Sequence, residues 1–227
     1  MTAAERIRPL TATQRHRLGL LALVFAAAFC AAAALAEGRL LFGAELWVQQ
    51  RVQAGRSPRL ERPMRTASLL GSGGVLVAAA GVACLALWRR QRRLSLALAV
   101  VAATGYLASD LAKLVAIRQR PNTVMWAFPS AHTFGIVVFL GMLVYLLWAL
   151  DVSPGRRRLA TVAGALAVVA VAGSRLYLNA HWVGDVVGGV AGGAAFVLAG
   201  VLVIDWRLGA VPAGAEPPTR RLDTVTG

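Results

Sequence analysis

The stretch TFGIVVFLGMLVYLLWAL, residues 133–150, contains no charged side chain. As an α-helix rising about 1.5 Å per residue, it is long enough to cross most of a hydrocarbon core about 30 Å thick. Five other apolar stretches of comparable length are Leu18 to Ala36, Ala67 to Trp88, Leu94 to Val115, Leu159 to Tyr177 and Val186 to Ile204. With Thr133 to Leu150, they predict an all-α integral membrane protein with six transmembrane helices.

The composition agrees with a membrane protein. Of 227 residues, 58% are hydrophobic and 15% charged, against about 25% charged in soluble domains. Basic residues outnumber acidic ones by 24 to 10, a net charge of +14, which we attribute to a membrane rather than to a nucleic-acid partner. The two cysteines, Cys30 and Cys84, lie in different apolar stretches and predict neither a disulfide nor a metal site.

Arginine clusters give an orientation. The connections after the second and fourth stretches are short and basic, and both termini also carry arginines. Because basic loops stay in the cytoplasm, we expect both termini and these two loops there. The predicted organisation is a cytoplasmic segment over residues 1–17, a membrane domain over 18–204 and a disordered cytoplasmic tail over 205–227.

The connection from Gly38 to Thr66 lies outside by parity although it holds six arginines. Its apolar residues recur at helical spacing, with polar residues on other faces: Leu40, Leu41, Ala44, Trp47, Val48 and Val52 against Glu45, Gln49, Gln50 and Gln53. This pattern predicts an amphipathic helix lying on the membrane surface, with arginines facing lipid headgroups. A solvated loop is the alternative.

The first apolar stretch has a second interpretation. Arg15 and Arg17 precede it and the small residues Ala34-Leu35-Ala36 end it, which resembles a cleavable signal peptide. The stretch is long for a signal core, so we favour a retained helix. The orientation of the remaining helices is the same in both cases.

Polar residues gather at the ends of the predicted helices on the side opposite the arginine loops. They include the only lysine and two of the three histidines of the chain. The cluster comprises Lys113, Arg120, Ser130, His132, Arg175, His181 and Asp185. Burying a charged group within a membrane costs free energy, so such groups mark sites of ion pairing or chemistry.

Two segments of this cluster have chemical meaning by themselves. Ser130 can cap the helix that follows it, whose free N–H groups and dipole favour an anion, although a simple cap is the alternative. His181 and Asp185 are four residues apart, so the carboxylate can hold one imidazole nitrogen protonated and leave the other as a nucleophile. A structural pair at a helix start is the alternative. Lys113, Arg120 and Arg175 could likewise be interfacial residues.

Taken together, three cations and two histidines suit phosphate chemistry without a metal or another cofactor. The residues read Lys113-x6-Arg120-Pro121, Pro129-Ser130-Ala131-His132 and Ser174-Arg175-x5-His181-x3-Asp185. This arrangement resembles the three-part signature of the type 2 phosphatidic acid phosphatase (PAP2) superfamily, which contains lipid phosphatases. The resemblance is strong from about Thr104 to Gly193. Ala131 departs from it, because the family usually has glycine there.

The resemblance implies a role for each residue. His181 would attack phosphorus to form a phosphohistidine, Asp185 would orient His181, and His132 would protonate the leaving oxygen and activate water. The phosphate would be bound by Lys113, Arg120, Ser130, Ala131 and Arg175. Asp110 lies outside the signature, and we expect it to pair with Lys113.

The expected function is that of a metal-independent phosphatase at the outer face of a plasma membrane. Its substrate would be a membrane lipid phosphate or pyrophosphate, phosphatidate-like or polyprenyl, and no protein partner is predicted. One alternative is phosphotransfer to an acceptor other than water. A transporter is less favoured, because transporters place polar groups near the bilayer midplane and this chain places them at helix ends. An inactive scaffold is less favoured because ten motif positions, all except Ala131, are kept.

Overall fold

A computed structural model of the 227-residue chain describes residues 8–114, 116–123 and 126–209. Within these residues the regular secondary structure is helical apart from one isolated β-bridge between Gln119 and Trp126. The helices are α1 (Ala12–Glu37), α2 (Phe42–Ala54), α3 (Pro58–Leu70), α4 (Gly73–Trp88), α5 (Arg92–Ala112), α6 (Ala131–Ala149), α7 (Pro154–Tyr177) and α8 (Val183–Gly209). The predicted all-α class is therefore confirmed.

Five helices are long and apolar enough to cross a membrane, namely α1, α5, α6, α7 and α8. The predicted stretch from Ala67 to Trp88 is not one straight helix, because α3 and α4 meet at a bend of 50° and only together pass the same test. Gly71 at this bend packs against α6, where a Cβ would lie 2.8 Å from the His132 carbonyl oxygen. The predicted third stretch ends at Val115, which lies outside the described residues.

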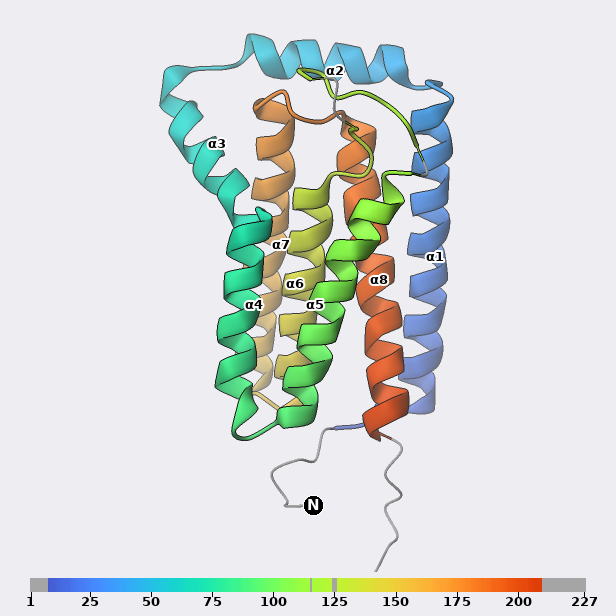
Figure 1. Ribbon diagram of the computed structural model, residues 1–227, viewed down its shortest axis with the longest axis vertical. Helices are drawn as coiled ribbons and strands as arrows, with labels where there is room; N and C mark the ends of the chain where they lie inside the picture. The colour runs from blue at the N-terminus through green and yellow to red at the C-terminus, as the bar shows by residue number, and fades with distance from the viewer. Residues whose placement is uncertain (1–7, 115, 124–125, 210–227) are drawn as a thin grey trace, which may run out of the picture.

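The long helices form an upright bundle with α6 at its centre (Figure 1). α6 contacts α4, α5, α7 and α8, whereas α1 packs along α8. The buried core joins Leu94 and Leu98 of α5 to Phe134 and Met142 of α6 and Val197 of α8. By contrast, large apolar side chains on the outside of α1, α4 and α7 are exposed. An apolar exterior of this kind suits a lipid environment.

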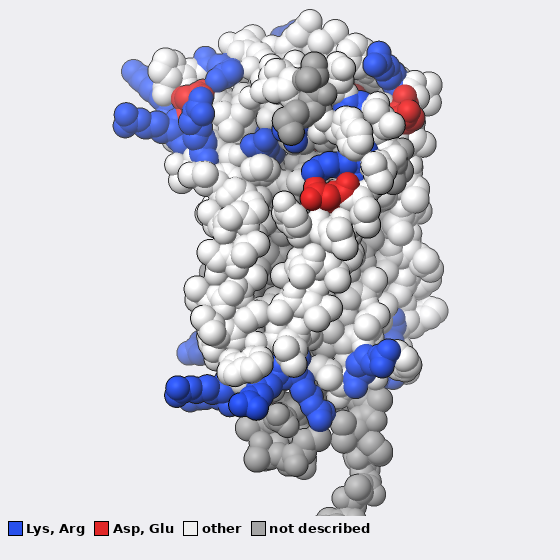
Figure 2. All heavy atoms as spheres, in the orientation of Figure 1, with Lys and Arg blue, Asp and Glu red and all other residues white. Residues whose placement is uncertain are grey.

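Charged side chains lie at the two ends of the bundle, and the belt between them is uncharged on the visible face (Figure 2). The α4–α5 and α6–α7 connections, the start of α1 and the end of α8 share the lower end (Figure 1). Here Asp205 is buried and accepts hydrogen bonds from the Leu10 N–H at 2.7 Å and from Arg15 Nε at 2.6 Å. This contact fixes the entry of the chain into α1 beside the end of α8.

The segment expected to be amphipathic does form a helix, and α2 lies across the upper end of the bundle (Figure 1). However, its polar side is turned inward. Glu45 and Gln49 are buried, while Leu41 and Trp47 are exposed. The Gln49 amide donates to the Leu176 carbonyl oxygen at 3.0 Å, so these polar residues bind the protein rather than solvent.

Candidate active site

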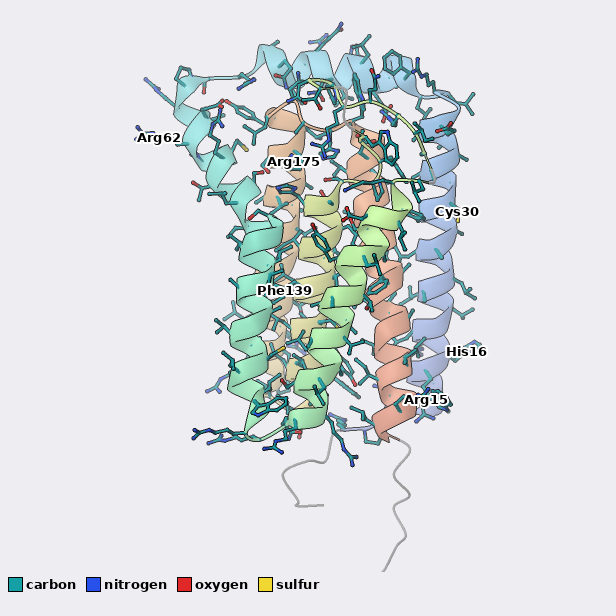
Figure 3. All side chains as sticks on the ribbon, in the orientation of Figure 1. Arg15, His16, Cys30, Arg62, Phe139 and Arg175 are labelled. Atoms are coloured by element: carbon teal, nitrogen blue, oxygen red, sulfur yellow. The ribbon has the colours of Figure 1, made fainter. Side chains whose placement is uncertain are left out.

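The predicted cluster lies at the upper end of the bundle, below α2. Figure 3 shows Arg175 near the upper end of α7, whereas Arg15 and His16 lie at the lower end of α1. Close packing of α8 on α6 brings the two histidine segments together. A Cβ on Gly189 would lie 2.8 Å from the Ser130 carbonyl oxygen, so glycine permits this approach. The Ser130 N–H also donates to the Asp185 carbonyl oxygen at 2.9 Å.

His181 and Asp185 are brought together as their spacing predicts. The distance from His181 Nδ1 to Asp185 Oδ2 is 3.4 Å, and the two residues are 1% and 0% exposed. Asp185 Oδ2 also accepts a hydrogen bond from the Trp182 N–H at 2.8 Å, which fixes the carboxylate. His181 Nδ1 has no hydrogen-bond partner among the described residues. Because Nδ1 faces the carboxylate, Nε2 is the nitrogen left to react.

Burial lowers the pKa of His181 below its ordinary value of 6.5. Asp185 opposes this effect, whereas the positive charges of Arg120 and Arg175 lower the pKa further. The imidazole is therefore neutral at physiological pH. A neutral imidazole is the form that a nucleophile needs.

Ser130 caps α6, as the sequence predicts. Its Oγ accepts a hydrogen bond from the Thr133 N–H at 3.5 Å and one from Thr133 Oγ1 at 3.1 Å. Ser130 and Thr133 are both fully buried. Ala131 and His132 follow in the first turn and line the same cavity as Lys113. The N-terminus of α6 thus opens beside a histidine and a lysine, an arrangement that favours an anion.

The three predicted cations have different surroundings. Arg175 is buried and donates through Nη1 to Ser68 Oγ at 2.5 Å, while its Nε has no partner among the described residues. Arg120 donates through Nε to the Trp126 carbonyl oxygen at 3.1 Å, and burial lowers its pKa. Lys113 forms an ion pair with Asp110, which confirms the predicted pairing. Arg175 is therefore a buried guanidinium whose Nε–H remains available to donate a hydrogen bond to an oxyanion.

Three residues near the site were missing from the predicted set. Ser68 is buried at the end of α3 and bonds Arg175 across 107 positions of sequence. Arg118 and Glu45 form a buried ion pair beside Asp185. Arg118 stands two positions before Arg120 and could have been suspected. Nothing in the local sequence connects Ser68 or Glu45 with the site.

An apolar cavity of about 680 Å³ lies between α4, α5 and α6 and reaches Lys113 and His132 of the cluster, whereas Arg120, Arg175 and His181 are not among its lining residues. Asp110, Lys113 and His132 are among its lining residues, and Cys84 and Met142 line it deeper in the bundle. Among the described residues, no three His, Cys, Asp or Glu side chains are grouped as metal ligands. The cavity combines charged groups at one end with an apolar interior, which matches an amphiphile.

Comparison with known proteins agrees with this geometry. The family model of the PAP2 superfamily matches residues 93–208, and the chain belongs to this superfamily. A similar solved structure is that of the first transmembrane PAP2-type phosphatidylglycerolphosphate phosphatase from Bacillus subtilis, with a TM-score of 0.71 and 21% sequence identity. The match covers 87% of this chain and 98% of the Bacillus protein. No match was found among curated proteins. Family membership supports the predicted enzyme class, a phosphoric ester hydrolase.

Proposed function

We propose that the protein is a metal-independent lipid phosphatase that works through a phosphohistidine on His181. The observation that carries this proposal is the orientation of the His181 ring, with Nδ1 3.4 Å from Asp185 and Nε2 left to react. The positive charges of Arg120 and Arg175 act on the same imidazole. A neutral, oriented nucleophile next to guanidinium groups is suited to attack a phosphate monoester or pyrophosphate.

In the first step, His181 Nε2 attacks phosphorus and the bond to the leaving lipid oxygen breaks. His132 donates a proton to that oxygen, and Asp185 stabilises the positive charge that develops on His181. Arg120, Arg175 and Lys113 neutralise the phosphoryl oxygens, and the α6 N-terminus behind Ser130 adds N–H donors. In the second step, His132 takes a proton from water, which attacks phosphorus and restores His181 as inorganic phosphate leaves.

A lipid substrate is supported by the cavity next to the cations. An acyl or prenyl chain in the 680 Å³ space would place its phosphate beside Lys113 and His132. The similar Bacillus protein is described as a phosphatidylglycerolphosphate phosphatase. We propose phosphatidate-like lipids and polyprenyl pyrophosphates as the leading substrate classes.

The proposed topology has six spans, with α3 and α4 forming one bent span. Residues 18–204 would then form the membrane domain, with both termini in the cytoplasm. Arginines of the α4–α5 and α6–α7 connections lie at the lower end of the bundle with the described termini (Figure 2). The positive-inside rule places this end in the cytoplasm of a plasma membrane and the catalytic cluster outside. α2 would lie at the outer interface.

Phosphotransfer is the second candidate, because a phosphohistidine can pass its phosphoryl group to an alcohol as well as to water. A transporter or an inactive scaffold is disfavoured by the buried His181–Asp185 pair at the end, not the middle, of the bundle.

The direct test is phosphate release by the purified protein from phosphatidate, phosphatidylglycerol phosphate and undecaprenyl pyrophosphate. We expect turnover of at least one lipid and no turnover by the His181→Asn variant. Loss of the lipid phosphate without release of inorganic phosphate, in the presence of an alcohol, would indicate transfer. No turnover of any of these lipids would contradict the proposal.

A further inference from the structure

A buried ion pair joins α2 to the loop that precedes α6. Arg118 Nη2 lies 2.8 Å from Glu45 Oε2, and Nη1 lies 3.4 Å from Oε1. The two side chains are only 8% and 10% exposed. Desolvation makes such a pair costly unless both groups have further partners. The further partners of this pair lie in the candidate active site.

Arg118 reaches Asp185 on its other side. Arg118 Nε lies 3.5 Å from Asp185 Oδ1, an oxygen without a hydrogen-bond partner among the described residues. The Asp185 carboxylate thus faces His181 with Oδ2 and Arg118 with Oδ1. One guanidinium is therefore shared between two carboxylates.

Glu45 holds the backbone of the same segment. Its Oε1 accepts a hydrogen bond from the Gly184 N–H at 2.7 Å, one residue before Asp185. The Arg118 guanidinium also lies 5.6 Å from the centre of the Trp182 ring, and the Trp182 N–H donates to Asp185. Residues 181–185 are thus contacted both by Glu45 of α2 and by Arg118 of the loop before α6.

We infer that Arg118 and Glu45 are positioning residues, which set the orientation of Asp185 and act through it on His181. Without Glu45, Arg118 would draw Asp185 away from His181. Without Arg118, the Glu45 and Asp185 carboxylates would repel each other in a buried space. This inference rests on the proposed role of His181 as nucleophile.

The charges near His181 determine in which direction each substitution should shift the pKa of His181. The charged and titratable groups that act on His181 are Asp185 of α8, Arg175 of α7, His132 of α6 and Arg120 of the loop before α6. Arg118 of that loop contacts Asp185, and Glu45 of α2 contacts Arg118 and the Gly184 N–H. Removing the positive charge of Arg118 favours the imidazolium and raises the pKa of His181. Removing the negative charge of Glu45 lowers it. A pair that is not electrostatically coupled to His181 would not produce opposite shifts.

The experiment is an NMR titration of the full-length, histidine-labelled protein in detergent micelles. The chain has three histidines, so His181 can be assigned with single substitutions of His16 and His132. We expect Arg118→Gln to raise the pKa of His181, Glu45→Gln to lower it, and the double variant to return it toward the wild-type value. Arg118→Lys keeps the charge and should leave this pKa near that of the wild type.

Activity provides the second measurement. Both single neutral variants should lose about tenfold or more in kcat with little change in KM, because the phosphate-binding cations are unaltered. Glu37→Gln is the matched control, since Glu37 Oε2 accepts from the Ile117 N–H of the same loop at 2.8 Å but is exposed. This control should leave the pKa of His181 unchanged.

Shifts in the same direction, or no shift, would overturn the inference even if activity falls. Failure of every charge-changing variant to fold would also overturn it, by showing that the pair serves folding. If the wild type releases no phosphate from any lipid, the proposed function fails, whereas the titration still measures the coupling of Arg118 and Glu45 to His181.

Discussion

His181 Nδ1 lies 3.4 Å from Asp185 Oδ2, and both residues are almost completely buried. They are four positions apart in a chain that has only three histidines. The carboxylate can keep the proton on Nδ1 and so direct the lone pair of Nε2 toward a substrate. This relationship is the basis of the catalytic role proposed for His181.

The lowered pKa of His181 predicts the pH dependence of the reaction. As the pH falls, a nucleophilic imidazole is lost only when it is protonated, so a lower pKa keeps it active in more acidic solution. We expect the acid limb of kcat/KM to lie below pH 6.5. Asp185→Asn removes the group that raises this pKa and should move the limb to still lower pH. A limb above pH 6.5 in the wild type would contradict the assignment.

Ser68→Ala tests the support of Arg175. The variant removes the acceptor of the Arg175 Nη1 hydrogen bond at 2.5 Å, and hydrogen bonds to charged groups contribute about 1.5–3 kcal/mol. We expect kcat/KM for phosphate release to fall about tenfold or more. Ser72→Ala is the control, because Ser72 Oγ donates to the Leu69 carbonyl oxygen at the same bend in an exposed hydrogen bond. Equal losses in the two variants would mean that the bend, and not Arg175, is affected.

Metal independence is a separate prediction. The carboxylates near the site are Asp110, Asp185 and Glu45; Asp110 is paired with Lys113, and both Asp185 and Glu45 contact Arg118, so they do not form a two-metal clamp. EDTA should leave phosphate release nearly unchanged, whereas vanadate, which can imitate pentacoordinate phosphorus, should inhibit it. Loss of activity in EDTA with recovery on addition of magnesium would disprove the mechanism.

The orientation of the bundle can be tested by labelling. Asn122 and Ser153 are exposed and lie at opposite ends of α6. In a background with Cys30 and Cys84 replaced by alanine, Asn122→Cys should react in intact cells with a membrane-impermeant thiol reagent. Ser153→Cys should react only after the membrane is opened. The reverse pattern would invert the proposed topology.

Most residues of the candidate site can be predicted from the sequence because they lie next to helix ends. The positions of Ser130 and His181–Asp185 follow from local rules, a helix cap and an i, i+4 pair. Ser68 and Glu45 could not be found in this way, since they reach the site across 107 and 139 positions through packing of α3 and α2. Such contacts depend on tertiary structure and have no local signal.

The sequence predicts the positions of helices that are defined by long apolar stretches. It does not predict features that depend on packing between helices. At the bend between α3 and α4, Gly71 lies against Val171 and His132, a contact that the apolar pattern does not show. The helical spacing of residues 40–53 predicts a helix, and α2 forms over Phe42–Ala54. It did not reveal that Glu45 and Gln49 face the protein, because amphipathicity alone does not say which side is buried.

The measurement that tests the central claim most directly is acid-labile phosphate on the protein after a quenched reaction with p-nitrophenyl phosphate. Its leaving group departs as a stable anion, so the first step needs His181 more than His132. The His132→Asn variant should release a burst of nitrophenol, then turn over slowly and hold phosphate. The His181→Asn variant should give neither a burst nor bound phosphate. Phosphate trapped by the His181 variant but not by the His132 variant would contradict the account.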